Sequence, residues 1–383
     1  MEETAMRLLV IAGVLWVLSM AFAACRVAYA RRMSGKKCKS DASCCPPVTL
    51  VVLSQNQEQE LRKSLPLFLG QDYPGEMYVS VVDVRSEDDT MRYLEDMESR
   101  YRILSHSSVP ASARDISMQR LAMALGFRSA STDWVIFTHA GCCPSSSGWL
   151  ASFASHCGEG KDAVVGATVL QRPLHGDEGK YQWLRLWRQC RWMPWAEKHR
   201  PVAAEDSLFA CRTGCFMKSG GFGKDNMLVC GASALLLNRL VEPGRCAAAM
   251  EGGSVLTEHL GGVHRWTLDR MYSMETSSRA RRPLLYRFFG FLDAVLPLLL
   301  LAIGVAAMLV AGEDRVVLTA VPAALIVGMA VRSWSFSAVC RGLGVPRYYL
   351  SNMWYELLLP FWTMGAWLRW KTAGKNTFRK KFV

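Results

Sequence analysis

The cysteines of this 383-residue sequence form neither a metal-ligand pattern nor a redox pair. There are thirteen of them, yet no CxxC pair occurs, and no cysteines and histidines are spaced as in a zinc site. Two pairs are adjacent, at 44–45 and 142–143, and Cys211 lies four residues before Cys215. We therefore expect reduced thiols that serve as small buried hydrophobic residues in a reducing compartment.

A base-reading motif is also missing, although the net charge of the chain is +12. Lys and Arg gather beside the apolar runs, in three groups: Arg26, Arg31, Arg32, Lys36, Lys37 and Lys39; Arg279, Arg281, Arg282 and Arg287; Arg369, Lys371, Lys375, Arg379, Lys380 and Lys381. This distribution suits the anionic lipid headgroups at a cytoplasmic membrane face. We expect a lipid bilayer as partner and no nucleic acid.

Charge is absent from residues 8–25, in a chain that is 51% hydrophobic. At about 1.5 Å per residue this run nearly crosses a hydrocarbon core of about 30 Å. The alternative is a cleaved signal peptide, but such a peptide begins with a basic segment, whereas residues 1–7 are acidic on balance. We predict a transmembrane anchor at 1–30 and a basic linker at 31–46. The charges place the N-terminus outside and the next domain in the cytoplasm, in a multi-pass protein of the inner membrane.

The C-terminal membrane region, 277–370, contains two more apolar runs. Residues 288–311 and 316–331, joined by a short polar connection, predict a hairpin of two membrane-spanning helices. Asp293 lies about one turn inside the first run, where we expect its carboxylate to snorkel to the interface. The stretch 348–370 is rich in Trp and Tyr and predicts an interfacial or re-entrant helix, followed by a basic cytoplasmic tail at 371–383.

Between residues 47 and 276, short β-rich runs alternate with helical stretches. The β-rich runs are 48–54, 77–83, 134–138 and 163–169, and helical stretches include 57–69 and 115–130. This order predicts an α/β domain with a mostly parallel sheet covered by helices on both faces. Ligands bind beyond the carboxyl ends of such strands, so Ser54, Asp83 and His139 should face one crevice.

Several segments of this domain resemble a family 2 glycosyltransferase with a GT-A fold. VTLVVLSQNQE from Val48, LGQDYP from Leu69 and VSVVDVRSEDDT from Val79 resemble the family's opening. RDISMQRLAMALG from Arg114, DWVIFTHAGCCP from Asp133 and GWL from Gly148 are similar to its helix, its metal-binding strand end and the helix that follows. The resemblance covers about 48–266, and the flanking apolar runs suit membrane-bound bacterial members, although the catalytic motifs here are degenerate.

The resemblance implies a nucleotide diphosphate sugar as donor. Ser54, Asn56 and Asp83 match the positions that hold its base, and Arg265 is placed to pair with its diphosphate. For Asp83 an equal alternative is a cap or turn residue before a helix that starts within 86–90.

The family's metal-binding Asp-x-Asp motif aligns with His139, Ala140 and Gly141. Both carboxylates are replaced, and a single imidazole makes a weak site for a hard divalent cation. We therefore predict no metal site and no cofactor, with magnesium or manganese involved only if the site is rewired. A partly buried, hydrogen-bonded histidine is the expected state of His139.

The family's catalytic base is a carboxylate in an acid pair that opens a late helix, where it takes the proton of the acceptor hydroxyl. The aligned residues are Ala232, Ser233 and Ala234, none of which is acidic. Asp225 and Glu251 are acids that lie nearby in the sequence, one before and one after this segment, and we take them as candidate substitutes.

On the acceptor side, the resemblance implies a glycine loop at Gly220 and Gly221, for which a tight turn is the alternative. Trp266 belongs to a His264-Arg265-Trp266 segment that keeps the Arg-Trp of the family's Gln-x-x-Arg-Trp motif, and its ring could stack on a sugar. Snorkelling at the membrane surface explains Arg265 and Trp266 equally well. The segment 181–200, rich in Trp and Arg, predicts an interfacial helix or the wall of a lipid-linked acceptor site.

Two functions from different classes fit these observations. The first is a membrane-bound transferase that moves a sugar from a nucleotide diphosphate to a lipid-linked or surface-polysaccharide acceptor. The second is an inactive GT-A-like scaffold or regulatory partner of an active glycosyltransferase, which the missing carboxylates favour. A transporter fits less well, because two or three spans form too small a bundle for a pathway.

Overall fold

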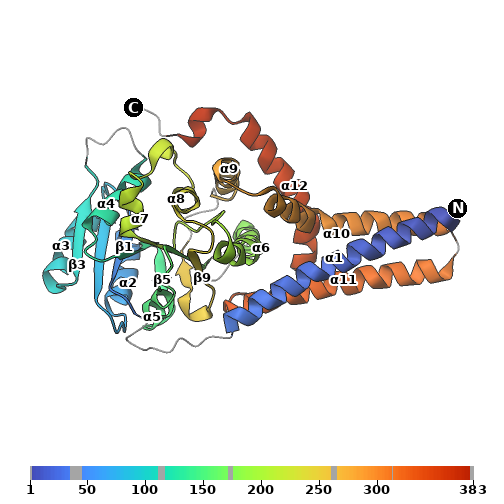
Figure 1. The fold of residues 1–383 in the computed structure, drawn as a ribbon, viewed down its shortest axis with the longest axis horizontal. Helices are drawn as coiled ribbons and strands as arrows, with labels where there is room; N and C mark the ends of the chain where they lie inside the picture. The colour runs from blue at the N-terminus through green and yellow to red at the C-terminus, as the bar shows by residue number, and fades with distance from the viewer. Residues whose placement is uncertain are drawn as a thin grey trace. The chain divides into compact units, whose positions relative to one another are not determined.

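A computed structural model describes residues 2–34, 45–110, 117–170, 176–259, 265–312 and 314–379 (Figure 1). The chain divides into two compact units. The helical unit comprises Met1–Gly35, Trp183–Cys190 and Arg282–Leu368. The sheet unit comprises Lys36–Gln182, Arg191–Arg281 and Arg369–Val383.

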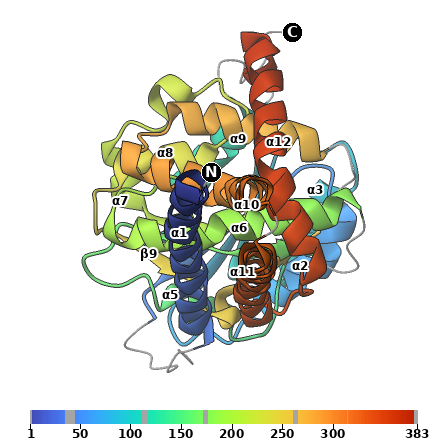
Figure 2. The ribbon, with the colours of Figure 1, turned by 90° about the vertical axis from the view of Figure 1, so that its right-hand side faces the viewer.

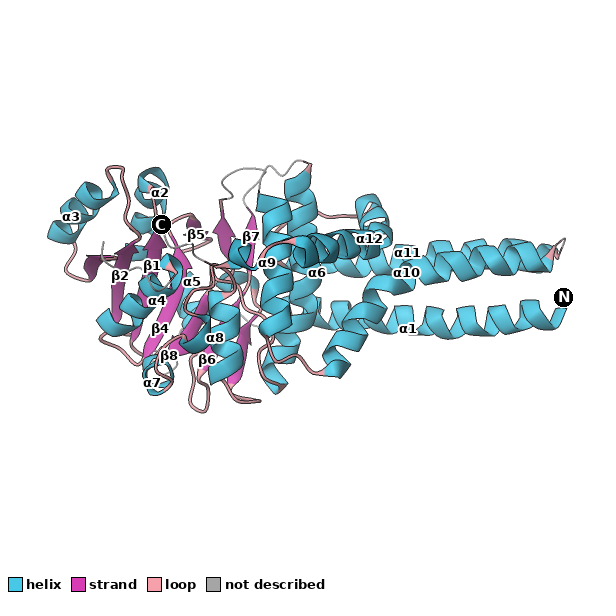
Figure 3. Ribbon diagram, turned by 90° about the horizontal axis from the view of Figure 1, so that it is seen from above, coloured by secondary structure: helices cyan, strands magenta, loops and turns pink. Residues whose placement is uncertain are grey.

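Within the described residues, the sheet unit contains a seven-stranded sheet in the order β3-β2-β1-β4-β8-β6-β9 (Figure 3). Strand β8 alone runs antiparallel to its neighbours, so the predicted α/β class with a mostly parallel sheet is confirmed. The strands are β1 (Val48–Ser54), β2 (Met77–Asp83), β3 (Leu104–Ser108), β4 (Trp134–His139), β6 (Ala163–Gly166), β8 (Phe209–Arg212) and β9 (Cys246–Ala249).

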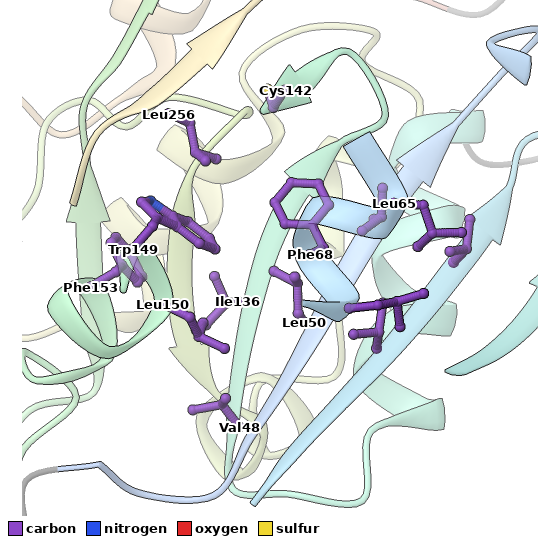
Figure 4. Packing of buried hydrophobic residues seen from close by; sticks show 14 of the residues in the cluster. Val48, Leu50, Leu65, Phe68, Ile136, Cys142, Trp149, Leu150, Phe153 and Leu256 are labelled. Atoms are coloured by element: carbon purple, nitrogen blue, oxygen red, sulfur yellow. The ribbon is translucent and has the colours of Figure 1, made fainter. Parts of the chain in front are cut away.

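Helices cover both faces of this sheet, as predicted. Because side chains alternate along a strand, Leu50 and Val52 point to one face and Val51 to the other. On the first face α2 (Glu58–Leu69), α3 (Thr90–Arg100) and α5 (Trp149–Ala154) complete the core (Figure 4). On the second face lies α4 (Met118–Ser129), where Gly126 meets Val51 with no room for a Cβ. All seven residues of β1 are buried, which explains its uninterrupted apolar run.

A smaller sheet adjoins the carboxyl end of β4. It has the order β5-β10-β7, formed by Cys142–Pro144, Leu256–Glu258 and Thr168–Leu170. The remaining elements of the sheet unit are α7 (Thr213–Lys218), α8 (Ala232–Leu240), α9 (Arg265–Arg279) and the short 3-10 turns Gly223–Asp225, Gly252–Ser254 and Lys375–Phe378.

Helix α6 (Asp177–Lys198) differs from the interfacial helix predicted for 181–200. Trp183, Trp187 and Trp192 are buried in the protein, so they form no exposed aromatic face, and the role of this helix beside a lipid-linked acceptor stays a prediction. Trp183 belongs to the helical unit, where it contacts Tyr355 and donates its Nε1–H to Asn352 Oδ1 at 2.8 Å. The indole nitrogens need partners when buried, and here a protein side chain supplies one in place of an interfacial water.

The helical unit is built on α1 (Glu2–Ser34), α10 (Leu284–Ala311), α11 (Arg315–Gly342) and α12 (Leu350–Thr372). Three helices among the described residues are long and apolar enough to cross a membrane: Met6–Met33, Leu284–Ala311 and Arg315–Gly342. The third is longer than the predicted run of 316–331. Small residues allow close contact, as where Gly328 of α11 meets Trp16 of α1, whose indole N–H donates to the Ala324 carbonyl at 3.0 Å.

Asp293 does not snorkel, because its carboxylate is buried in a ring of four charges. We call this ring the four-charge cluster; it has one residue from each of four helices: Arg26, Asp293, Arg332 and Glu356. The ion-pair distances are 2.5 Å for Arg26–Glu356, 2.6 Å for Glu356–Arg332, 2.8 Å for Arg332–Asp293 and 3.3 Å for Asp293–Arg26. A buried carboxylate is far less costly when paired with arginines, which explains why it stays inside the bundle.

Candidate functional site

The candidate site lies where β2, β1 and β4 end and the antiparallel β8 begins. Ser54 and Asp83 lie at the ends of β1 and β2, as predicted, and the structure pairs them in register. Ser54 Oγ and, on β4, Thr138 Oγ1 are buried hydroxyls that have no hydrogen-bond partner among the described residues. Buried hydroxyls are normally hydrogen-bonded, so this edge of the sheet has unused polar capacity.

Asp83 shapes a turn at the end of β2. Its carboxylate accepts hydrogen bonds from the Ser86 backbone N–H at 3.0 Å and from Ser86 Oγ at 2.5 Å, and it is almost fully buried. This agrees with the turn alternative stated for Asp83, and the base-binding role stays a prediction. Helix α3 begins at Thr90, where Asp88 accepts from the Thr90 N–H at 3.1 Å, so the structure starts the helix at the far end of the predicted window.

Asn56 ties the loop after β1 to the loop after β2. Its backbone N–H donates to Ser86 Oγ at 2.8 Å, and its Oδ1 accepts from the Glu87 N–H at 2.7 Å. Asn56 and Arg85 both have positive φ, 51° and 55°, a region that non-glycine residues enter rarely. Such backbone conformations persist where the surroundings enforce them, and they are concentrated at functional sites.

The strand-end motif of β4 offers poor ligands for a hard cation. His139 is half-buried, Ala140 donates its N–H to the Leu53 carbonyl at 2.9 Å, and the Gly141 carbonyl accepts from the His259 N–H at 2.9 Å. The described residues contain no group of three or more His, Cys, Asp or Glu that could hold a metal ion. One imidazole without carboxylates does not fit magnesium or manganese, which prefer several oxygen ligands.

The start of α8, where the resemblance places the base, is closed to solvent. Ala232 and Ser233 are buried, and Gly231 has a φ of 61° at a point where a Cβ would overlap Thr276. The two aligned side chains therefore lack an acid and also lack access to a substrate.

Asp206 supplies a carboxylate at this place, and the sequence analysis missed it. Its Oδ1 accepts the Ser233 backbone N–H at 2.8 Å and also the Ser233 hydroxyl, while Gln119 Nε2 donates to its Oδ2 at 3.3 Å. Asp206 is half-buried, unlike Ala232 and Ser233, which are fully buried. It lies in the turn before β8, and because β8 pairs antiparallel with β4, the start of β8 lies at the carboxyl end of β4.

The two acids predicted as substitutes have other partners. Asp225 Oδ1 lies 3.7 Å from Arg279 Nη1, and Glu251 Oε2 lies 2.8 Å from His156 Nε2, just after α5. Both were chosen because they lie near Ser233 in the sequence. Asp206 is 27 residues away, and only its place in an acidic Glu205-Asp206 pair before a strand could have drawn attention to it.

Arg239 holds the predicted glycine loop on the acceptor side, and Arg120 holds the segment that follows it. Gly220 and Gly221 have φ values of 69° and 85°. Arg239 of α8 donates to the Gly221 carbonyl and, at 2.6 Å, to the Phe222 carbonyl. Arg120 of α4 donates to the carbonyls of Leu228 at 3.0 Å and Cys230 at 2.7 Å. The conformation of this loop is therefore fixed by side-chain hydrogen bonds.

The Arg-Trp motif is only partly described. Residues 260–264, including Gly262 and His264, lie outside the described residues, and the side chain of Arg265 is not described either. Trp266 opens α9, where its ring contacts Tyr181 edge-on and Arg270 lies 5.0 Å from its ring centre. Its stacking on a sugar stays a prediction.

The C-terminal segment is docked on the sheet unit, although we predicted only a basic tail. Phe378 is buried with Leu228, Leu235 and Ala280, and its carbonyl accepts the Val229 N–H at 3.2 Å. Trp370 donates its indole N–H to Glu275 Oε2 at 2.8 Å. The segment thus covers the loop that leads into α8.

We expect Phe378→Ala to release this segment, because removing a buried phenylalanine ring costs roughly 3 kcal/mol. The Val229 amide should then exchange with solvent at least tenfold faster in hydrogen-exchange measurements. Thr377→Ala, at an exposed neighbouring position, is the control and should leave the exchange rate unchanged. Equal exchange rates in the two variants would show that the docked segment does not hold the loop.

The described cysteines are all free, with no disulfide among them. Burial raises the pKa of Cys246 to about 12 and that of Cys230 to about 11, so both thiols are neutral at physiological pH. This agrees with the expected role as small buried hydrophobic residues.

No protein-family model matches the sequence, and no curated protein matches it. A mannosyltransferase of Pyrobaculum calidifontis, PcManGT in complex with GDP-Man and Mn²⁺, is 19% identical with a TM-score of 0.53. The match covers 93% of this chain and 99% of that one, so it extends well into the helical unit. At this identity the likeness shows the fold alone, which is GT-A-like.

Other solved structures are more distant. TarS 1–349 of S. aureus in complex with UDP-GlcNAc is 13% identical with a TM-score of 0.42, and the match covers 85% of this chain and 91% of that one. The glucosyl-3-phosphoglycerate synthase of Mycobacterium tuberculosis, in complex with Mn²⁺, UDP and its product, is 14% identical with a TM-score of 0.39, covering 63% and 82%.

Proposed function

We propose that this protein is a membrane-bound glycosyltransferase of the family 2 type. Its donor is a nucleotide diphosphate sugar, and its acceptor is a hydroxyl group on a lipid-linked or surface-glycan molecule. The GT-A-type fold supports this proposal, as do three helices apolar enough to span a membrane. The basic residues beside those helices favour the inner membrane, with the sheet unit on the cytoplasmic side.

The observation that carries the proposal is the carboxylate of Asp206 at the start of α8. The Ser233 N–H and hydroxyl orient one of its oxygens, while the other receives only the longer contact from Gln119. In the proposed reaction Asp206 takes the proton of the acceptor hydroxyl. The acceptor oxygen then bonds to the anomeric carbon, the bond from that carbon to the diphosphate breaks, and the nucleoside diphosphate leaves with the electron pair.

An activity assay with the purified full-length protein tests this proposal. Release of nucleoside diphosphate would be followed with UDP- and GDP-sugars and a membrane-lipid extract as acceptor, in EDTA, magnesium or manganese. We expect turnover that differs by less than about twofold among these conditions, because the ligands at His139–Gly141 do not suit either cation. Nucleotide binding without turnover would instead support the inactive scaffold, which the buried, acid-free positions 232 and 233 favour.

We expect Asp83→Ala to weaken nucleotide binding about tenfold or more. A hydrogen bond to a charged group contributes roughly 1.5–3 kcal/mol, and the substitution also frees Ser86, which anchors Asn56. Isothermal titration with UDP and GDP measures the affinity. Ser86→Ala is the companion variant, since it loosens the turn but keeps the carboxylate. Equal losses in both variants would assign Asp83 to the turn alone.

We also expect the sheet unit to be shielded from outside reagents. Cys157 and Cys246 are buried and make poor reporters, whereas Tyr78 on β2 is exposed, so Tyr78→Cys provides a suitable thiol. An impermeant maleimide should label this variant in inverted membrane vesicles and not in intact cells. The unsubstituted chain is the control for background labelling. Labelling from outside intact cells would reverse the proposed topology.

A further inference from the structure

Helix α12 exposes more large apolar side chains than a helix of a soluble protein does. Its inner side buries two polar residues, Asn352 and Glu356, together with Leu359 and Ala366. Its outer side carries an exposed apolar stripe, with residues spaced three or four apart along the helix: Leu350, Trp354, Leu358, Phe361, Met364 and Leu368. Trp354 is 66% exposed and Phe361 is 53% exposed. Large apolar side chains in a continuous stripe require an apolar environment or a partner.

The inner face of α12 is fixed by strong contacts, so the helix cannot turn its apolar side inward. Glu356 pairs with Arg26 of α1 and with Arg332 of α11, while Asn352 donates to Ser333 Oγ at 3.2 Å and accepts from Trp183. Rotating the helix would leave two buried arginines without Glu356, which is costly in a low-dielectric bundle.

The direction of α12 distinguishes it from the three apolar helices. In Figure 2, α10 and α11 are seen nearly end-on and α1 is seen obliquely, whereas α12 is seen from the side at its full length; in Figure 1, α12 crosses the direction of the other three helices. If α1, α10 and α11 span a bilayer, the segment Leu350–Leu368 therefore lies in the plane of that bilayer.

The depth of α12 follows from the four-charge cluster. About 18 residues separate Asp293 from the far end of α10 at Ala311, and a helix of that length spans about 27 Å. A hydrocarbon core is about 30 Å thick, so the cluster lies at the level of one membrane interface. Glu356 holds α12 at the same level.

We infer that the outer face of α12 is a lipid-contact surface that lies flat in the interfacial layer of one leaflet. Trp residues favour this layer, and cationic side chains flank the stripe on both sides, with Arg347 before the helix and Arg369 and Lys371 at its end. These charges suit anionic phospholipid headgroups better than a second copy of the same cationic helix. The inference rests on the membrane placement in the proposed function, and it adds that the enzyme's surface contacts lipid beside the spanning bundle.

Photo-crosslinking in lipid nanodiscs tests this inference. The full-length protein would be placed in nanodiscs of phosphatidylethanolamine and phosphatidylglycerol, with benzoylphenylalanine introduced singly at Trp354, Phe361 or Leu368. Exposed Tyr78 of the sheet unit is the aqueous control, and exposed Val14 of α1 reports the membrane placement itself. Mass spectrometry identifies each adduct and the acyl carbon to which it is attached.

We expect at least tenfold more lipid adduct at the three α12 positions than at Tyr78, attached at a similar shallow depth in each case. Adducts at Val14 should lie deeper in the acyl chain. Attachment that deepens toward Phe361 would show that α12 spans the membrane, and adducts to a second protein copy would show an oligomer interface; either result overturns the inference. If lipid adducts form at Val14 and none form at the α12 positions, the inference about α12 is wrong and the membrane placement stands. If no lipid adducts form at Val14 or at α12, the membrane placement itself is wrong.

Discussion

Replacing Asp206 with asparagine is expected to lower kcat by about 10²–10⁴, the usual contribution of a positioned general base. Asparagine keeps an acceptor oxygen for the Ser233 N–H, so the start of α8 should stay intact while the base is lost. Asp206→Ala should lower kcat as much and should also destabilise the fold by about 0.5–2 kcal/mol, because the cap of α8 is lost. Steady-state turnover and thermal unfolding, measured on the same samples, separate the two effects.

Three further variants complete this experiment. Asp72→Asn, at an exposed position after α2, is the matched control and should keep full activity. Asp225→Asn and Glu251→Gln test the acids chosen by sequence proximity, and we expect activity within about threefold of the unsubstituted chain, since neither acid touches the reacting atoms in the proposed reaction. Full activity of Asp206→Asn, combined with loss of turnover in either of these two, would transfer the role of base away from Asp206.

Removing one member of the four-charge cluster should cost about 3–5 kcal/mol, because it leaves a buried charge without its partner. In Arg332→Met, Asp293 loses the nearer of its two arginines and Glu356 loses one of its two, while Arg26 remains beside both carboxylates. The apparent Tm in detergent or nanodiscs should fall clearly. Arg341→Met is the control, with the same change at an exposed position of the same helix.

A double variant shows whether charge balance is the cause. In Arg332→Met combined with Glu356→Met, Arg26 and Asp293 remain as a pair, and well-packed apolar side chains often replace buried ion pairs at little cost. We expect this double variant to recover most of the stability lost in Arg332→Met. A double variant as unstable as the sum of its two single variants would indicate that packing, and not the unpaired charge, sets the cost.

Much of the fold could be predicted from the sequence, because the responsible signals are local. Apolar runs of helical length identified the three long helices, since any such run avoids water wherever the chain places it. Buried strands such as Val48–Ser54 are apolar at nearly every position, and their alternation with helices predicted the parallel sheet. The edge strand β3 was missed because its sequence, LSHSS, is largely polar and only partly buried.

The tertiary structure alone decided which charged groups meet. Asp206 and Ser233 are 27 residues apart, and Arg26 and Glu356 are 330 apart, so no periodicity in the sequence relates them. Sequence proximity selected Asp225 and Glu251, but in the folded chain Asp206 is the acid that contacts Ser233. The position of Asp293 in its helix suggested that it snorkels, but in the folded chain it pairs with Arg26 and Arg332. Electrostatic pairing depends on the distance between charges in space, which is set by how the strands and helices are arranged in the fold. Hydrophobic patterning depends only on the order of residues along the chain and can therefore be recognised in the sequence.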